Sequence, residues 1–136
     1  MTYVLDANAI VALVKNEEGA DVVDNLIVQS ANGGFNVCMN KYNLLEVYYG
    51  FYREDGEVFA EKQIKKIRES PIVIIDTLSD KVFRQAGRFK ATYKVSLADA
   101  VVLAQGAADS SVIVSSDHHE FDTVEENEKI KFLWFR

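Results

Sequence analysis

Cysteine, proline and long hydrophobic runs are almost absent from this chain of 136 residues. The single cysteine, Cys38, excludes an internal disulfide and suits a reducing compartment, so we expect a cytoplasmic protein. Pro71 is the only proline, and no long Pro-rich or Gly-rich linker interrupts the chain. The longest apolar runs are a few residues, too short for a membrane helix, and no secretory leader follows Met1.

Basic residues are outnumbered as well. The chain has 15 Lys and Arg against 21 Asp and Glu, for a net charge of −6 and a pI of about 4.9. A passive nucleic-acid binder would usually be basic, whereas an acidic chain can hold a pocket that recruits cations. With 49% hydrophobic residues, the chain can bury a core, and we predict a single domain over residues 1–136.

Strand-like and helical patterns alternate along the sequence. Strands are expected at about 3–6, 35–39, 72–75, 112–115 and 131–135. Helices are expected at about 8–15, 20–30, 41–53, 57–69, 80–93 and 97–107. The run at 72–75 is β-branched throughout, which predicts a buried strand. The alternation predicts a three-layer α/β/α sandwich with a mainly parallel sheet of about five strands.

Four carboxylates occupy unusual places in this pattern. Asp6 ends the first strand and Asp117 follows the fourth, while Glu46 lies among apolar and aromatic residues and Asp99 lies in the first turn of an apolar helix. Taken singly, each could be a cap, a turn residue or a surface charge. Strand ends and helix starts share one edge of a parallel sheet, however, and this is the edge where α/β proteins bind ligands. We therefore expect the four to converge.

Convergent carboxylates would raise one another's pKa and repel, and a divalent metal ion is the simplest way to keep them ionised together. Oxygen ligands suit Mg²⁺ or Mn²⁺ rather than Zn²⁺. Our hypothesis is that Asp6 and Asp99 hold the ion while Glu46 and Asp117 complete the site. Asn8 could add a carbonyl oxygen or orient Asp6.

The order of these motifs resembles a known family. It runs from Leu-Asp-x-Asn at 5–8, through Glu46, to Leu-Ala-Asp-Ala at 97–100 and Ser-Ser-Asp-His-His-Glu-Phe-Asp at 115–122. Over essentially its whole length the chain is similar to PIN-domain nucleases, and most similar to the VapC toxins of toxin–antitoxin modules. The resemblance implies that Asp6, Glu46, Asp99 and Asp117 bind metal and that Asn8 supports them. Glu120 and Asp122 are both candidates for a further acidic ligand.

The resemblance also implies an activity and partners. The expected activity is metal-dependent endoribonuclease cleavage of RNA that leaves a 5′-phosphate, by in-line attack of water with no side chain as nucleophile. The expected partners are the RNA substrate, a small antitoxin whose tail occupies the site, and a second copy of the chain in a homodimer. No membrane partner is expected.

Other polar and aromatic residues have plainer interpretations. His118 and His119 are read as polar loop residues, and the aromatic cluster of Tyr48, Tyr49, Phe51 and Tyr52 as mostly core. Five basic residues could contact phosphates or simply be solvated, namely Arg53, Arg84, Arg88, Lys90 and Lys94.

Three alternatives stay open at this point. One is a PIN-domain ribonuclease that processes RNA without an antitoxin, and another is a PIN domain that binds protein without catalysis. The third belongs to a different class, a Mg²⁺-dependent phosphotransfer module, which Asp76-Thr77 at the end of the third strand keeps open. No companion lysine motif supports it.

Overall fold

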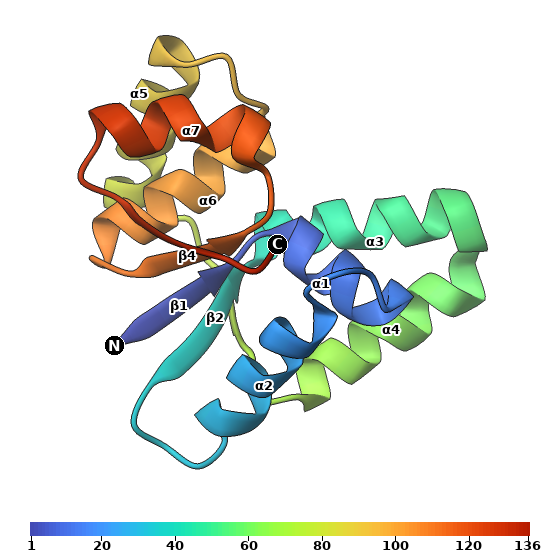
Figure 1. Cartoon of the computed structure of the whole chain (residues 1–136). Coiled ribbons are helices and arrows are strands. Elements are labelled where there is room, and N and C mark those ends of the chain that lie inside the picture. Colours follow the sequence, from blue (N-terminus) through green and yellow to red (C-terminus); the bar gives the residue numbers. More distant parts are fainter.

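A computed structural model describes all residues, 1–136, and has one parallel sheet in its centre (Figure 1). The sheet has five strands in the order β3-β2-β1-β4-β5, and every neighbouring pair is parallel. The strands are β1 (Thr2–Leu5), β2 (Asn36–Asn40), β3 (Val73–Ile75), β4 (Val112–Ser115) and β5 (Lys131–Trp134). The predicted parallel α/β/α fold is confirmed.

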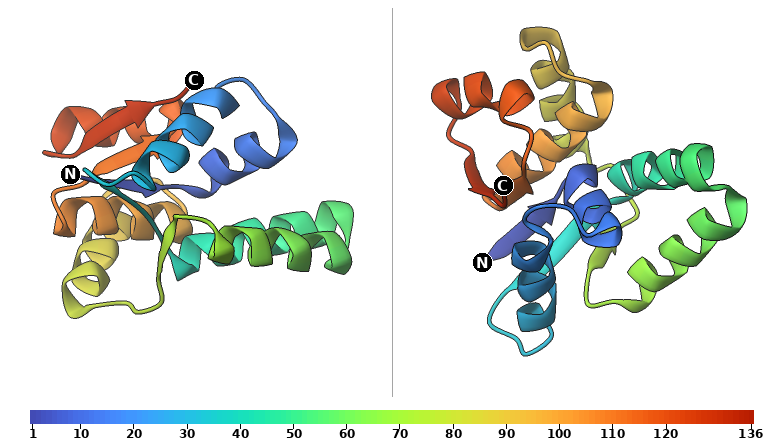
Figure 2. Two further views of the ribbon diagram at one scale, coloured as in Figure 1. Left: turned by 90° about the horizontal axis from the view of Figure 1, so that it is seen from below. Right: turned by 45° about the vertical axis from the view of Figure 1, so that its right-hand side comes forward.

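Seven helices cover the two faces of the sheet. On one face lie α1 (Ala7–Lys15), α2 (Ala20–Ser30), α3 (Lys41–Asp55) and α4 (Glu57–Glu69). On the other lie α5 (Asp80–Thr92), α6 (Leu97–Ala108) and α7 (His118–Asn127). Each group packs on its own apolar cluster, and α3 and α4 form a hairpin that extends past the sheet (Figure 2). No helix combines the length and apolarity that crossing a bilayer requires.

The chain reverses its direction of travel across the sheet between β1 and β4. It runs outward from β1 through β2 to the edge strand β3, and then returns to place β4 and β5 on the other side of β1. Such a switch point opens a crevice beyond the carboxyl ends of the two central strands, where ligands bind in open α/β sheets. Asp6 follows β1, and Asp117 follows β4 by one intervening residue.

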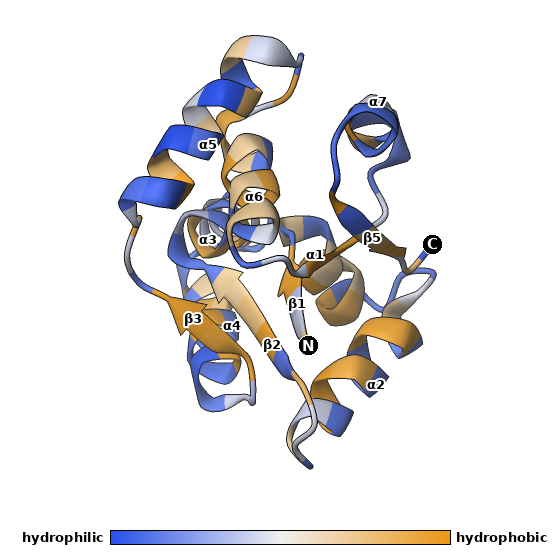
Figure 3. Cartoon of the chain, turned by 90° about the vertical axis from the view of Figure 1, so that its left-hand side faces the viewer, coloured by the Kyte–Doolittle hydropathy of each residue, from blue (hydrophilic) through white to orange (hydrophobic).

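Helix α6 is buried as expected, because it packs between the sheet and α5. Eight of its twelve residues are buried, and the hydropathy colouring of its ribbon is mostly apolar (Figure 3). Its chain direction brings its first turn, with Asp99, to the carboxyl edge of the sheet, since its last turn leads into β4. The strands and α6 therefore deliver three of the four predicted carboxylates to one edge.

Several local predictions are wrong, each for a physical reason. The third strand is not buried, because β3 pairs only with β2 at the sheet edge and leaves Val73 55% exposed. The helical spacing of apolar residues over 57–69 predicts that Val58 faces the core, yet this residue is 85% exposed, since it lies at the tip of the α3–α4 hairpin. In the aromatic cluster only Phe51 is fully buried, while Tyr49 and Tyr52 are exposed on α3.

His118 and His119 are not loop residues. They begin α7, a helix that the sequence analysis missed. Asp117 caps this helix by accepting a hydrogen bond from the Glu120 backbone N–H at 3.2 Å. An acidic cap with Glu three residues on is a capping pattern, and Phe121 and Val124 supply buried residues at helical spacing, so the signal was present.

Candidate active site

Asp6 is a buried carboxylate at the start of α1. It is 4% exposed and caps the helix, with its Oδ1 accepting a hydrogen bond from the Ala9 N–H at 2.9 Å. Its pKa is raised from 3.8 to about 7, chiefly by burial and to a smaller extent by the charges of Asp99 and Asp117, while hydrogen bonds from Ser115 and Ala9 oppose the rise. A carboxyl group with this pKa is only partly ionised at neutral pH, and a bound cation would favour its ionised form.

Ser115 ties Asp6 to the neighbouring strand. Its hydroxyl donates to Asp6 Oδ2 at 2.5 Å and accepts from the Asp117 N–H at 3.0 Å. The register that pairs Leu5 with Val114 places Ser115 beside Asp6. This role of Ser115 cannot be predicted from the sequence, because a strand register cannot be read from one sequence and a serine at a strand end is common.

Asp99 lies in the first turn of α6, partly buried beside the other acids. Ser96 caps this helix by accepting from the Asp99 N–H at 3.0 Å. Burial raises the pKa of Asp99 to about 6, assisted by the charges of Asp117 and Glu120 and opposed by hydrogen bonding to Ser96. The capping interpretation of Asp99 is thus correct, and it coexists with close electrostatic contact to the other carboxylates.

Glu46 faces the same acidic group from α3. Burial raises its pKa, and the charges of Asp99 and Asp117 raise it further. One turn earlier, Asn43 is buried and its amide donates to the Ala98 carbonyl at 2.9 Å. This bond joins α3 to the first turn of α6, so that Glu46 and Asp99 lie on adjoining helix surfaces.

Asn8 and the further acidic candidates fall in different places. Asn8 lies in the first turn of α1, is exposed, and is not among the hydrogen-bond partners of Asp6. Glu120, on α7, is half-buried and acts on the pKa of Asp99. Asp122 is exposed and pairs instead with His118 at 3.3 Å. Of the two further acids, Glu120 is therefore the one whose charge acts on Asp99.

The donor set fits a divalent cation of the Mg²⁺ type. No three His, Cys, Asp or Glu side chains form a ready-made coordination shell. Mg²⁺ does not require one, because it retains several waters and commonly binds one or two carboxylates directly. Asp6, Glu46 and Asp99 all have raised pKa values partly because their charges repel, which is the penalty a bound cation would remove.

Most of the candidate phosphate-binding cations are already engaged. Arg88 makes a two-pronged ion pair with Glu128 at 2.8 and 3.2 Å, and Lys90 donates to the Val95 carbonyl at 2.8 Å. Arg53 lies over the Tyr49 ring at 5.6 Å. Lys94 is exposed and belongs to none of the ion pairs of the chain.

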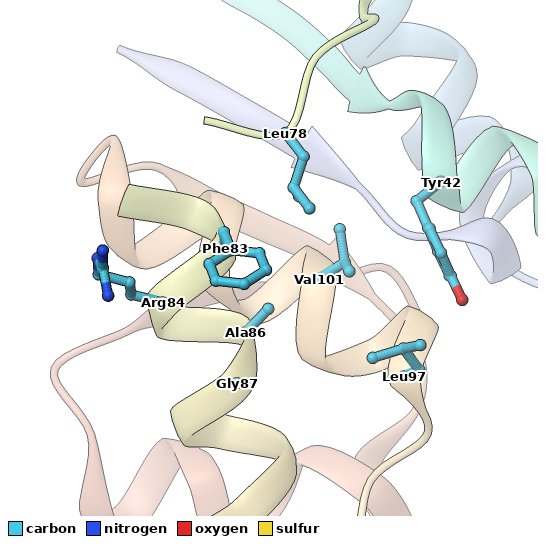
Figure 4. Close-up of a pocket in the computed structure, with 8 residues that line it drawn as sticks. All are labelled: Tyr42, Leu78, Phe83, Arg84, Ala86, Gly87, Leu97 and Val101. Atoms are coloured by element: carbon cyan, nitrogen blue, oxygen red, sulfur yellow. The ribbon is translucent and has the colours of Figure 1, made fainter. Parts of the chain in front are cut away.

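The largest cavity lies away from the acids. It has about 590 Å³ and is an open apolar groove between α5, α6 and the start of α3 (Figure 4). Leu78, Phe83, Leu97 and Tyr42 line it, with exposed fractions of 39 to 58%. Tyr42 and Leu97 also line a second cavity of about 230 Å³ that reaches Glu46, so the apolar face borders the acidic edge.

These features define a doubly wound α/β protein with a carboxylate site at its topological switch point. A family model of the PIN domain matches residues 3–127, so the chain belongs to the PIN domain family. None of the curated proteins matches the sequence.

Solved structures share the fold at low sequence identity. VapBC2 from Rickettsia felis, bound to promoter DNA, matches with a TM-score of 0.75 and 19% identity over 98% of both chains. VapBC-1 from nontypeable Haemophilus influenzae matches with a TM-score of 0.74 and 15% identity, over 99% of this chain and 98% of that one. VapC20 from Mycobacterium tuberculosis, a toxin that cleaves the sarcin–ricin loop, matches with a TM-score of 0.63 and 13% identity, over 83% and 87%.

Proposed function

We propose that this protein is a divalent-metal-dependent endoribonuclease and the toxin of a toxin–antitoxin pair. The observation that carries the proposal is the buried Asp6 carboxylate, whose pKa is raised to about 7 beside Asp99 and Asp117 at the switch point of a PIN-family sheet. Family membership adds the reaction class, and the oxygen-only donor set adds the choice of Mg²⁺ or Mn²⁺.

The roles of the residues follow from their placement. When bound, the divalent ion would act as a Lewis acid toward the phosphodiester and promote ionisation of water. Asp6 and Asp99 are assigned to hold it, with Glu46, Asp117 and Glu120 around them. Asn8 keeps its proposed supporting part at the exposed start of α1. Ser115 orients Asp6 through its bond to Oδ2, and each carboxylate oxygen of Asp6 keeps a lone pair for a cation.

The test is cleavage of single-stranded RNA by purified protein with Mg²⁺ or Mn²⁺ and with EDTA. Asp6→Asn and Asp99→Asn should each lower the rate at least about 100-fold, since each removes a charge that holds the ion. Asp76→Asn is the matched control, because Asp76 also follows a strand but pairs with Lys41 and Arg68. Full activity without divalent ions, or in both site variants, would contradict the proposal.

The Asp76→Asn variant also tests the phosphotransfer alternative. A receiver-like module would use the carboxylate at the end of β3 as its phosphate acceptor. Asp76 is instead ion-paired on the surface, at 3.4 Å from Arg68 and 3.7 Å from Lys41. If Asp76→Asn abolished a phosphoryl transfer that Asp6→Asn spared, the alternative would replace the nuclease assignment.

An antitoxin partner is supported by the solved structures that share the fold. Several of them are toxin–antitoxin complexes, including those from Rickettsia felis and Haemophilus influenzae. Expression of the wild type should arrest growth, Asp6→Ala should not, and co-expression of the small protein encoded next to it should restore growth. Arrest that no neighbouring protein relieves would instead favour a PIN-domain ribonuclease without an antitoxin.

We also propose that a second copy of the chain covers the apolar groove. Leu78, Phe83 and Leu97 are exposed side by side, and exposed apolar faces of this kind mark interaction sites. Two copies that each carry a charge of −6 repel least through a face with little charge, and six of the eight lining residues are hydrophobic. A two-fold axis through the groove would bury the face of each copy at once.

Light scattering on eluted protein tests this second proposal. The wild type should have the mass of a dimer, and Phe83→Glu should convert it to a monomer. Val58→Glu is the control, because Val58 is 85% exposed on α4 and lies outside the groove. A monomeric wild type would contradict it, and so would a dimer that Phe83→Glu leaves intact.

A further inference from the structure

A second, polar cavity lies beside the acidic edge. It has about 400 Å³ and is formed by the end of α5, the connection to α6 and the first turns of α7. Its lining consists of Thr92, Tyr93, Lys94, His119, Glu120 and Thr123. The Glu120 backbone N–H donates to Asp117 Oδ1 at 3.2 Å, so this cavity lies directly beside the acidic edge.

The aromatic wall of the cavity is held in place from behind. The Tyr93 hydroxyl donates to Glu128 Oε2 at 2.6 Å, and Arg88 grips both oxygens of the same carboxylate. Phe89 packs against Tyr93 in a tilted arrangement, with 6.2 Å between the ring centroids. A half-buried ring fixed in this way loses little further freedom when a flat ligand stacks on it.

The other lining groups are free to contact a ligand. Lys94 and His119 are exposed, and Lys94 forms no ion pair within the chain. Thr92 and Thr123 add hydroxyl groups. A fixed aromatic ring, an unpaired ammonium and hydroxyls within one small cavity are the groups that bind a base and its phosphate in single-stranded RNA.

We propose that this cavity binds one nucleotide of the RNA strand, next to the phosphodiester that the acidic site cleaves. The base stacks on Tyr93, and Lys94 contacts the phosphate of that nucleotide. Glu120 would repel a phosphate, so the phosphate lies at the Lys94 end and the base and sugar fill the remainder. His119 forms the wall on the α7 side. The assignment rests on the proposed ribonuclease function.

Equilibrium binding of a short fluorescein-labelled single-stranded RNA tests the cavity without cleavage. The measurements use the Asp6→Asn protein at low salt and add each further variant to it. Tyr93→Leu should raise the Kd about five- to tenfold, since it removes a stacked base contact. Lys94→Ala should raise the Kd about threefold or more and lower the slope of log Kd against log salt by about one. His119→Ala should weaken binding by a similar factor.

Two variants separate a site from general effects. Lys62→Ala removes the same charge from an exposed, unpaired lysine on α4 and should change the Kd less than about twofold. Tyr93→Phe keeps the ring but loses the bond to Glu128, so its Kd should lie between those of the parent and Tyr93→Leu. Equal weakening by Lys94→Ala and Lys62→Ala, or no effect of Tyr93→Leu in a folded protein, would overturn the proposal.

Cleavage kinetics distinguish failure of the cavity from failure of the nuclease assignment. In the otherwise wild-type protein, Lys94→Ala should raise KM about threefold or more and leave kcat unchanged, because it removes contacts made equally before and during reaction. Cleavage with an unaltered KM would overturn the cavity assignment alone. A wild type that cleaves no RNA with any divalent ion would overturn the nuclease assignment, while the binding measurements would still report on the cavity.

Discussion

Asp6 caps α1 and is also the residue proposed to hold the metal ion. Both roles favour an ionised carboxylate, whereas burial without a cation favours the protonated form. As an N-cap its carboxylate satisfies the Ala9 N–H, yet burial raises its pKa to about 7. Between pH 4 and 7 the native protein therefore binds more protons at this group than the unfolded chain does, so native stability falls as pH rises through that window. Asp99, with a pKa of about 6, adds to the same trend.

This linkage gives a prediction for protein in EDTA. The melting temperature should fall from pH 5 to pH 8, with a loss of stability on the order of 3 kcal/mol. Asp6→Asn should flatten most of the slope, because asparagine caps a helix without ionising. Added Mg²⁺ or Mn²⁺ should stabilise the wild type more at pH 8 than at pH 5. A stability that rises with pH in EDTA would contradict the assigned protonation.

Ser115 carries a second prediction at the same scale. Ser115→Ala removes the donor to Asp6 Oδ2 and leaves that oxygen buried without this partner, so the pKa of Asp6 should rise further. Cleavage should fall about 10- to 100-fold, as for other residues that orient metal ligands, and its pH profile should move to higher pH. Ser116→Ala is the control, since its hydroxyl bonds Arg136 rather than Asp6. A lower rate with an unshifted profile would mean that Ser115 acts on folding alone.

At the scale of elements, the packing of α6 against β4 determines the position of Asp99. A Cβ on Gly106 would come within 2.6 and 2.7 Å of the Ile113 side chain, in a fully buried contact. Gly106→Ala should therefore destabilise the protein by about 1–3 kcal/mol through overpacking, despite the better helix propensity of alanine. Ile113→Val removes the Cδ1 methyl, which the added Cβ would approach to 2.7 Å. It should therefore recover part of that loss in the double variant.

Denaturant unfolding of the two single variants and the double variant measures this coupling. Gly50→Ala on α3 is the control, because its added methyl would meet no atom within 4 Å and should stabilise the protein or leave its stability unchanged. Strictly additive effects of Gly106→Ala and Ile113→Val would show that helix and strand separate freely there. In that case Asp99 would not depend on this contact for its position.

The elements also show which structural features can be predicted from a single sequence. The caps at Asn40, Ser79 and Ser96 were predictable because each acts within three residues, and the structure has all three. The edge position of β3 was not, since a β-branched run fits a central strand and an edge strand alike. The hydrogen bond between Ser115 and Asp6 was not predictable either. These residues lie 109 positions apart in the sequence, and only the register of β1 against β4 brings them together.

On the scale of the whole molecule, the proposed function requires an acidic protein to bind a polyanion. The net charge is −6. Part of that charge is concentrated at the acidic edge, where the charges of Asp99 and Asp117 raise the pKa of Glu46. Local charge should matter more than total charge, because monovalent salt screens exposed charges beyond about 8–10 Å while partly buried ones are screened much less. The distinction can be tested with two variants of equal net charge.

Glu46→Gln and Glu69→Gln each remove one negative charge, the first at the acidic edge and the second from an exposed residue on α4. In EDTA, Glu46→Gln should tighten RNA binding about two- to fivefold because it relieves repulsion at the site, whereas Glu69→Gln should change it little. With Mg²⁺ present, Glu46→Gln should instead lower the cleavage rate at least about tenfold, whereas Glu69→Gln should leave it unchanged. Fluorescence anisotropy and cleavage assays on the same preparations measure both effects. Equal tightening by the two variants would mean that net charge governs RNA binding, and the acidic edge would then not be where the strand lies.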